Sequence, residues 1–534
     1  MPELTVDNVQ ALHPLGKISS IFGEALVDEH VHILVRAPPV IPQKRALPTS
    51  EDPYEHAKHS KFVKNPLSTT GKPEFFESPQ KGPSGKISDD CPNPDSDFAP
   101  APLLYDGFGH FLDIMDGRPG VPGLADIDTM KLVSEVDEFA SKMNFEDYTD
   151  ERLQREAILP YLNRIFKARR GIEIPSLHAS AVSSGRGDGH NDAAHGAGTM
   201  VVQFKNTFAG GSVLFEEELT DFVTCLNVKG MEAHRKLYLG WRVPCLGLII
   251  VGQRLRFYAV VAVDHRFKFL TLTSMYSCTE TASDGRDRKS LYLAFTAASV
   301  LQAQILHDIE KFRNNPPPEL PIRKRGFPAV SKLRKYPPSE SDDHLHFEIQ
   351  SFFQDRESYR LLYVAETQQR QSILIKFTPW YSILLHDICA RSGHAPQVLA
   401  FERLPGGWYA VAMEYVKSAV SITQSTQFAA HGDRWANELC ELMDKFHSEG
   451  LVHGDLRDAN ILCKDDSVML IDFDWGGTDG TVSYPTADLN KELLEGRVSN
   501  DLRITKEDDR RILKRTLEKL RNIHTSSSQS GSFY

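Results

Sequence analysis

The sequence lacks several features that define particular classes of protein. Only 7 of its 534 residues are cysteines, and no two of them form a CxxC pair, so neither a disulfide framework nor a cysteine zinc site is expected. The net charge of -11 excludes a uniformly basic nucleic-acid coat protein. The N-terminus has neither the basic nor the apolar stretch of a conventional secretory signal. The longest apolar runs, such as residues 246–251, are far shorter than the roughly 18 residues of a membrane span, so no contact with a membrane is expected.

One stretch near the C-terminal end carries the clearest chemical pattern. His453-Gly-Asp-Leu-Arg-Asp-Ala-Asn460 is followed by Leu470-Ile-Asp-Phe-Asp-Trp475. An acid, an amide and a second acid at this spacing, each beside a short apolar run, are the groups that phosphoryl transfer requires. Asp455 would orient a hydroxyl nucleophile, and Asn460 and Asp472 would hold Mg²⁺ against phosphate oxygens.

These two motifs resemble the catalytic loop and the metal-binding motif of the protein-kinase fold. The H-G-D-L form is similar to that of aminoglycoside phosphotransferases, lipopolysaccharide kinases and fungal kinase-like proteins. The resemblance implies a two-lobed domain over residues 345–525 that uses ATP and Mg²⁺. By position it makes Asp455 the catalytic base, gives Arg457 the place of the lysine that steadies the γ-phosphate, and gives His453 a structural role. A helix predicted from the apolar spacing over residues 435–446 leads into the loop.

The preceding residues fit the nucleotide-binding side of such a domain. Lys376 lies in a predicted strand over residues 372–377, from which its ammonium would reach the α- and β-phosphates. The run Met413-Glu-Tyr-Val416 looks like the hinge between two lobes. The backbone groups of Glu414 and Val416 would meet the adenine there.

Three departures from the kinase pattern leave a pseudokinase open as an alternative. No glycine occurs between Glu348 and Gln371, where a phosphate-covering loop is expected. The helix after Lys376 has no clear acidic partner for it, with Asp387 a weak candidate. The chain after Asp474 is short for a substrate-binding lobe.

Residues 103–313 alternate predicted helices and strands and resemble the PD-(D/E)XK restriction-endonuclease-like superfamily. The resemblance rests on polar residues of the types that such a site uses: Glu156 on an early helix, Asp188 or Asp192 before a strand, and Gln203 and Lys205 on that strand. In this family the carboxylates bind a divalent metal and the lysine positions the attacking water. Gln203 stands where the superfamily has an acid. A solvated α/β domain without nuclease activity is therefore the alternative.

The remaining segments complete the predicted organisation. Residues 1–37 end in a β-branched strand before two prolines and resemble the last part of the N-terminal domain found in the Crinkler effector family. Three segments are predicted to lack a packed core: a disordered linker over 38–102, a Pro-rich basic linker over 314–344 and a disordered tail over 526–534. The basic cluster over 323–335 is interpreted as a nuclear import signal, a phosphate-contacting arm or a solvated linker.

We therefore expect a multidomain protein of the α/β and α+β classes. A restriction-endonuclease-like α/β domain would be followed by a compact two-lobed protein-kinase-like domain. The combination resembles Crinkler-type nuclease–kinase effectors, which implies export by a non-conventional route and action in a host cell nucleus. The expected function is an ATP- and Mg²⁺-dependent serine/threonine-kinase-like phosphotransferase acting on a protein, with DNA as a partner of the endonuclease-like domain. The alternatives are a pseudokinase joined to a DNA-binding or DNA-cleaving domain, and a fungal kinase-like protein of the cytoplasm or nucleus of the producing cell.

Overall fold

The structure is a computed structural model, and it describes residues 99–530 with internal gaps. The gaps lie at 146–147, 149, 180, 183–184, 187–188, 192–197, 206–218, several positions between 220 and 232, 264–265, 280–284, 339–342, 354–360, 487–488 and 498–500. All the described residues belong to one compact unit, Ser50–Tyr534. The predicted Crinkler-like segment over 1–37, residues 38–98 of the predicted linker, and both Asp188 and Asp192 lie outside the described residues.

The first part of the described chain is built on a six-stranded sheet. Its strands follow the order β3-β4-β5-β6-β7, with β8 paired to β6. Only β4 and β5 run parallel; the other described pairs of this sheet are antiparallel. The bounds are β3 Gly189–His190, β4 Met200–Lys205, β5 Cys245–Val251, β6 Arg254–Val263, β7 Arg266–Thr271 and β8 Tyr276–Ser277, with the separate pair β1 Ala181–Val182 and β2 Gly185–Arg186. Every residue of β5 is buried, as expected for a strand covered on both faces.

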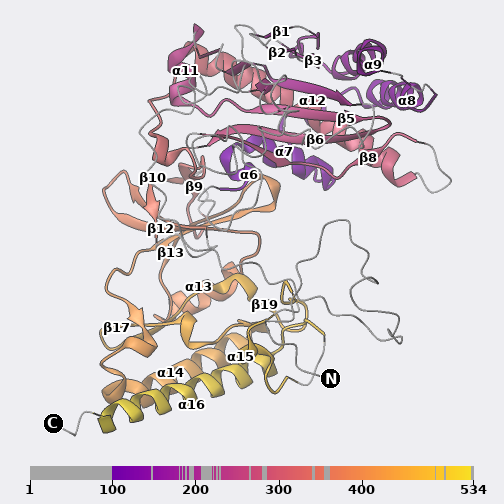
Figure 1. The fold of residues 1–534 in the computed structure, drawn as a ribbon. Helices are drawn as coiled ribbons and strands as arrows, with labels where there is room; N and C mark the ends of the chain where they lie inside the picture. The colour runs from indigo at the N-terminus through magenta and orange to yellow at the C-terminus, as the bar shows by residue number, and fades with distance from the viewer. Residues whose placement is uncertain are drawn as a thin grey trace, which may run out of the picture. The chain divides into compact units, whose positions relative to one another are not determined.

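Helices surround this sheet (Figure 1). Their bounds are α6 Ala101–Leu104, α7 Asp106–Met115, η2 Leu124–Asp126, α8 Thr129–Phe145, α9 Glu151–Phe166, α11 Arg235–Gly240 and α12 Gly285–Asn314. The helix α12 packs against α7 and α8, and α8 packs against α9. Asp150 caps α9, because its side chain accepts a hydrogen bond from the Leu153 N–H at 2.8 Å. The strands predicted over 199–206, 246–251, 255–263 and 267–272 and the helices predicted over 131–168 and 285–313 are present, whereas the helix predicted over 215–226 lies mostly outside the described residues. The helix α6 begins inside the segment predicted as linker.

Part of the segment 314–344, which was predicted to be a linker, is packed against the rest of the chain: residues 325–328 and Leu333 are buried. It holds η3 Ile322–Lys324 and the strand β9 Lys332–Arg334. Arg325 is fully buried, and its guanidinium donates to the carbonyl oxygens of Tyr238 and Leu239 at the end of α11. An arginine there satisfies carbonyls that a helix end leaves unpaired. Arg325 of the basic cluster is therefore a structural residue, whereas Arg323, Lys332, Arg334 and Lys335 are exposed, so the three interpretations of the rest of the cluster stay open.

The second six-stranded sheet is antiparallel and has the order β13-β14-β12-β11-β10-β9. Its further bounds are β10 His344–Phe352, β11 Leu361–Thr367, β12 Ser372–Thr378, β13 Val398–Arg403 and β14 Tyr409–Glu414, with η4 Pro405–Gly407 joining the last two. The helix α13, Ile383–Arg391, connects β12 to β13. The register places Lys376 of the central strand β12 between Leu362 and Val411.

A helical part follows the second sheet. Its elements are β15 Val420–Ser421, η5 Ile422–Gln424, α14 Phe428–Ser448, β16 Leu451–Val452, η6 Asp458–Asn460, β17 Ile461–Lys464, β18 Ser467–Leu470, η7 Phe473–Trp475, β19 Gly477–Thr478, α15 Lys491–Leu494 and α16 Lys506–Ser530. Helices α14 and α16 lie side by side (Figure 1). The apolar face of α14 is buried, as its spacing predicts. The helix α16 continues through residues 526–530, which were predicted to be part of the tail.

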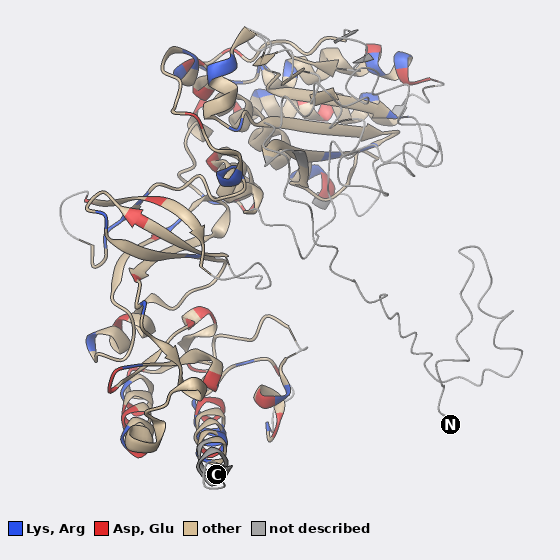
Figure 2. Ribbon diagram, turned by 60° about the vertical axis from the view of Figure 1, so that its left-hand side comes forward, with Lys and Arg blue, Asp and Glu red and all other residues tan. Residues whose placement is uncertain are grey.

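Two buried apolar clusters underlie this arrangement. One runs through both six-stranded sheets, and the other lies among the helices of the C-terminal part. The helix α7 of the first part contacts the second sheet. Its Asp113 pairs with Arg403 of β13 at 3.1 Å, and its Gly109 lies directly against Pro405 of η4. In Figure 2 the strands of both sheets carry few charged residues, whereas α16 is banded with both signs.

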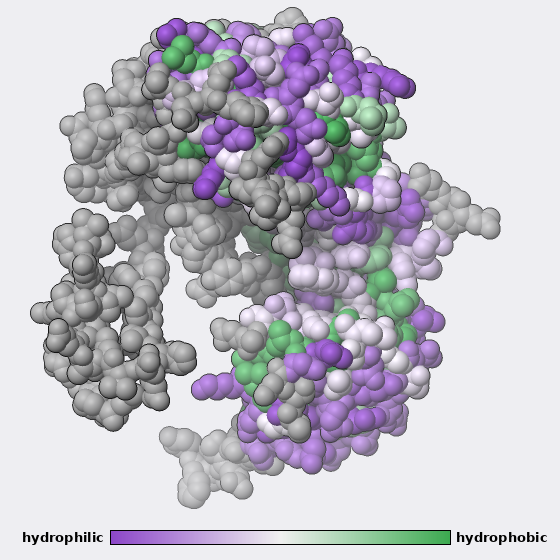
Figure 3. Space-filling view, turned by 90° about the vertical axis from the view of Figure 1, so that its right-hand side faces the viewer, coloured by the Kyte–Doolittle hydropathy of each residue, from purple (hydrophilic) through white to green (hydrophobic). Residues whose placement is uncertain are grey.

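The surface seen in Figure 3 is mostly hydrophilic, with separate apolar patches. No helix among the described residues is long and apolar enough to cross a membrane.

Candidate active site

Three segments bring the residues of the predicted phosphotransfer site together. Lys376 comes from β12, Asp455 and Asn460 come from the loop after β16, and Asp472 follows β18. The Lys376 Nζ atom lies 2.5 Å from Asp472 Oδ1. The hairpin of β17 and β18 places the last two segments next to each other, because the Ile471 N–H donates to the Asn460 carbonyl oxygen at 3.0 Å. Residues separated by almost a hundred positions in the chain are therefore neighbours.

Asn460 is held with its side-chain oxygen available. Its Nδ2 donates to the carbonyl oxygen of Asp455 at 3.0 Å, which orients the amide. Its Oδ1 is buried and accepts no hydrogen bond from the described residues. A buried polar atom without a partner is costly in a folded protein unless a ligand satisfies it. Together with the Asp472 carboxylate, this oxygen is the kind of donor that Mg²⁺ prefers.

This pair of oxygens fits a magnesium ion that phosphates complete. The described residues contain no group of three His, Cys, Asp or Glu side chains that could hold a metal by themselves. Mg²⁺ is commonly held by only one or two carboxylates together with phosphate oxygens. The donors on Asn460 and Asp472 are therefore suited to Mg²⁺ that arrives with a nucleotide.

Asp455 is paired with Arg457 in this structure. The Arg457 Nε and Nη2 atoms donate to the two carboxylate oxygens at 2.5 and 2.7 Å. This hydrogen bonding raises the pKa of Arg457 above its ordinary value. A bidentate pair of this kind is among the stronger hydrogen-bonded contacts in proteins. Each oxygen of the Asp455 carboxylate thus already accepts one hydrogen bond, and each keeps a further lone pair that could accept from a hydroxyl.

Asp509 on α16 holds the catalytic loop, and the sequence prediction did not include it. This residue is fully buried, and its carboxylate accepts hydrogen bonds from the backbone N–H groups of His453 and Gly454, each at 2.8 Å. The Nε2 atom of His447 lies 3.1 Å from the same carboxylate. The sequence did contain one indication that Asp509 is buried. Ile512 and Leu513, three and four positions further along, lie on the same helix face as Asp509, and this apolar face packs on the core.

The backbone at Asp472 is in an unusual conformation. Its φ and ψ angles are 68° and 67°, in the left-handed region. A non-glycine residue there costs of order 1–3 kcal/mol, and such residues cluster at functional sites. The conformation comes immediately before η7 and directs the chain so that Asp472 and Asp474 both reach Lys376.

Lys376 takes its second partner from η7, not from α13. Its Nζ lies 2.7 Å from Asp474 Oδ1. The pKa of Asp474 is raised to about 6, chiefly because the carboxyl is buried; the charge of Lys376 counteracts this rise and the charge of Asp472 adds to it. The weak candidate from the sequence, Asp387, pairs instead with Arg391 at 2.8 Å.

The helix α13 presents a histidine to the site. The His386 ring stacks on Phe473 with the ring centroids 4.5 Å apart and the planes 14° from parallel. Its ring nitrogens lie 2.6 Å from the Tyr381 hydroxyl oxygen and 2.8 Å from the Pro396 carbonyl oxygen. Burial lowers the pKa of His386 to about 4, so the ring is neutral near pH 7.

The predicted hinge residues lie at the end of β14. The Glu414 N–H donates to the Gln397 carbonyl oxygen at 2.9 Å, and the Val416 carbonyl oxygen accepts from the Ala419 N–H at 3.1 Å. The Val416 N–H makes no backbone hydrogen bond within the described residues, which leaves a donor of the type that would meet adenine.

The residues predicted for an endonuclease site are only partly placed together. Gln203 is buried within β4, and Lys205 lies at the end of this strand, 3.6 Å from Glu151. Glu156 lies further along α9, where its exposed carboxylate pairs with Arg152 at 3.2 Å. With Asp188 and Asp192 outside the described residues, the endonuclease site stays a prediction.

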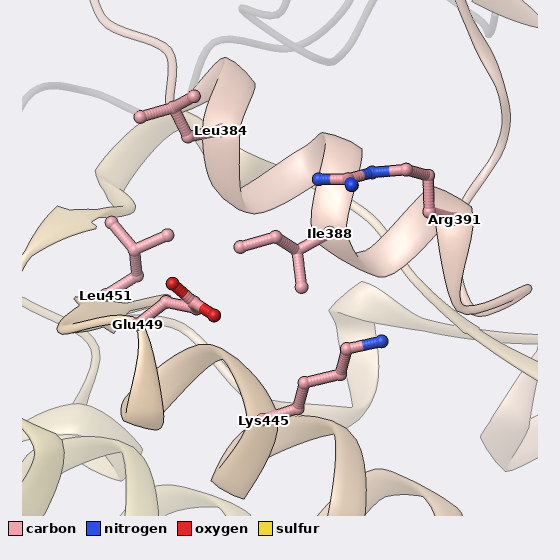
Figure 4. A pocket seen from close by; sticks show the side chains of 6 residues that line it. All are labelled: Leu384, Ile388, Arg391, Lys445, Glu449 and Leu451. Atoms are coloured by element: carbon pink, nitrogen blue, oxygen red, sulfur yellow. The ribbon is translucent and has the colours of Figure 1, made fainter.

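A separate open pocket of about 370 Å³ lies between α13 and α14. Its lining combines apolar and charged side chains, with Glu449 beside Leu451 on one side and the two basic residues on the other (Figure 4): Leu384, Ile388, Leu451, Arg391, Lys445 and Glu449. None of the phosphotransfer residues lines this pocket, so it is not the site of the predicted chemistry.

Comparison with known proteins found a family match over the segment that holds the catalytic loop. Residues 384–475 match the family model described as the RIO domain, which belongs to an atypical protein kinase family. This part of the chain is kinase-like. The matched residues of the kinase-like domain include α13, the catalytic loop and Asp472. Lys376 lies just before the match, on the strand that leads into α13.

Two further comparisons complete these findings. The solved structure of the Cydia pomonella granulovirus kinase PK-1 is similar over 33% of this chain and 70% of that chain, with 14% sequence identity and a TM-score of 0.27. The search of curated proteins found no match.

Proposed function

We propose that the kinase-like domain transfers the γ-phosphate of ATP, together with Mg²⁺, to a serine or threonine hydroxyl of a protein substrate. The observation that carries this proposal is the convergence of Lys376, Asp455, Asn460 and Asp472. One cation for phosphates, one buried carboxylate for a hydroxyl and two oxygen donors for a metal are gathered on adjoining segments. These are the parts that phosphoryl transfer needs, because the reaction depends on positioning and charge stabilisation.

Each side chain has a role that follows from its position. Lys376 would contact the α- and β-phosphates, and Asn460 and Asp472 would hold the metal. When bound, Mg²⁺ would neutralise charge on the phosphate oxygens. Arg457 would turn from Asp455 toward the γ-phosphate, since a guanidinium binds phosphate oxygens as well as it binds a carboxylate. Asp455 would accept the proton of the hydroxyl nucleophile.

Turnover of ATP tests this proposal directly. Purified protein is incubated with ATP and Mg²⁺, and release of ADP and autophosphorylation are measured for the wild type and for Asp455→Ala. Turnover by the wild type that falls at least a hundredfold in the variant is expected, because a positioned base contributes roughly 10²–10⁴-fold. Wild-type turnover no higher than that of the variant would refute catalysis through Asp455, and the absence of turnover in both proteins would indicate a pseudokinase.

The wider setting is proposed from the sequence resemblance alone. An effector of the Crinkler type would act inside a host cell, in its nucleus, after export by a non-conventional route. DNA would be the partner of the first domain if the resemblance to restriction endonucleases extends to function. Incubating plasmid DNA with Mg²⁺ or Mn²⁺ and either the wild type or Lys205→Ala tests the second point. Intact DNA in both reactions would rule out a nuclease that depends on this lysine.

A further inference from the structure

Lys376 is held by two carboxylates that come from the same short segment. Its Nζ lies 2.5 Å from Asp472 Oδ1 and 2.7 Å from Asp474 Oδ1. The helix α13, which follows β12 directly, gives no acid to this lysine. Asp387 pairs with Arg391, and the neighbouring position holds the neutral His386 stacked on Phe473.

We infer that Asp474 is the positioning residue for Lys376 when nucleotide is bound. The inference rests on the proposed function, in which Asp472 holds Mg²⁺. A carboxylate that binds a metal has less charge to share with a lysine, so Asp472 cannot be the lasting partner of Lys376. Asp474 is the other carboxylate already in contact with the ammonium. Lys376 is only 7% exposed, and a buried ammonium without an anionic partner is strongly unfavourable.

The surroundings of η7 fix Asp474 relative to the lysine. The ring of Phe473 lies between those of His386 and His453, with the centroid of the latter 5.3 Å away. The Phe473 carbonyl oxygen accepts a hydrogen bond from the Ser382 N–H at 3.1 Å. On the other side of Asp474, a Cβ atom on Gly476 would lie 2.7 Å from Leu385 Cδ2, so this turn packs tightly on α13.

The arrangement joins the lysine and the metal donor into one unit. Asp472 and Asp474 lie on either side of Phe473, so any movement of this segment shifts both the metal ligand and the anchor of Lys376. The helix α13 gives the lysine no acid and contacts this segment through His386 on Phe473 and Leu385 beside Gly476, so it acts on the lysine through η7. We therefore expect phosphate binding and metal binding to be gained and lost together.

The experiment measures nucleotide binding by calorimetry, because binding does not require turnover. ADP with Mg²⁺ and adenosine are the two probes, and only ADP carries the phosphates that Lys376 would contact. The variants are Asp474→Asn, Asp474→Glu, Lys376→Met and the double variant Asp474→Asn/Lys376→Met. The control is Asp466→Asn, which removes a 68% exposed carboxylate on the hairpin of β17 and β18.

A specific pattern is expected. Asp474→Asn raises the dissociation constant for ADP about ten- to a hundredfold, which is the affinity that one charge-assisted contact contributes. It leaves adenosine binding unchanged. Lys376→Met has a similar effect, and the double variant is no weaker than Lys376→Met alone, since Asp474 acts through the lysine. Asp474→Glu recovers most of the lost affinity because it restores the charge. Asp466→Asn binds both probes like the wild type.

Three results would overturn the inference while the wild type still binds ADP. The first is normal ADP binding by Asp474→Asn, and the second is an additive loss in the double variant. The third is an equal loss of ADP and adenosine binding by Asp474→Asn when urea unfolding shows that its stability is that of the wild type, because Asp474 would then not act specifically on the phosphates. A wild type that binds neither probe would instead refute the proposed function, and the inference with it.

Discussion

Replacing Asp509 with asparagine should damage both the stability and the activity of the kinase-like domain. The carboxylate is fully buried and accepts the backbone N–H groups of His453 and Gly454, each at 2.8 Å. Asparagine keeps one oxygen but turns an NH₂ group toward the second backbone N–H. One hydrogen bond to a charged group is lost, and two donors then face each other in a buried space.

The size of the effect follows from these contacts. A hydrogen bond to a charged group contributes about 1.5–3 kcal/mol, and a buried donor left unpaired costs about 1–3 kcal/mol. We expect Asp509→Asn to lower the free energy of unfolding by about 2–4 kcal/mol. Turnover should also fall, because the N–H groups held by Asp509 belong to the two residues that precede Asp455.

Urea unfolding and ATP turnover, measured on the same preparations, check this prediction. Glu507→Gln is the matched control, since it changes an 82% exposed carboxylate in the first turn of the same helix. The control should stay within about 0.5 kcal/mol of the wild type, as surface substitutions usually do. An Asp509→Asn protein with wild-type stability and turnover would refute the role assigned to this residue.

Three more predictions concern other parts of the chain. His386 titrates near pH 6.5 when unfolded but has a pKa of about 4 when folded, so the unfolded state binds the proton first as the pH falls. Unfolding in urea should therefore show stability decreasing between about pH 6.5 and 4 by up to about 1.4 kcal/mol per unit, and His386→Phe should remove that slope. Arg457→Ala should lower kcat about ten- to a hundredfold with a smaller change in the KM for ATP, as steady-state kinetics would show; a raised KM with an unchanged kcat would place its effect on binding instead. Gly109→Ala should destabilise the protein by about 1–3 kcal/mol in urea, because its Cβ would lie 2.6 Å from Pro405 Cβ; unchanged stability would show that this contact yields easily.

Local patterns in the sequence predicted much of the fold. The periodic apolar residues of α14 and the β-branched runs of β5, β6 and β12 each indicated their element, because a buried helix face and a buried strand impose different spacings. The strands β9 and β10 were missed. β9 has three residues, two of them basic, and forms a strand because it pairs along the edge of the sheet. β10 lies between β9 and β11, and the alternation of Leu345, Phe347 and Ile349 was a strand signal that the sequence prediction overlooked.

The sequence by itself determined the chemical groups of the candidate site. Asp455, Asn460 and Asp472 lie within a short span, so their spacing alone indicated phosphoryl transfer. The tertiary structure decided which groups surround them. Asp474, in place of an acid on α13, holds Lys376, and Asp509 of α16 anchors the loop. Contacts between residues distant in the chain depend on how helices and sheets pack, and the spacing of residues in one segment carries no record of that packing.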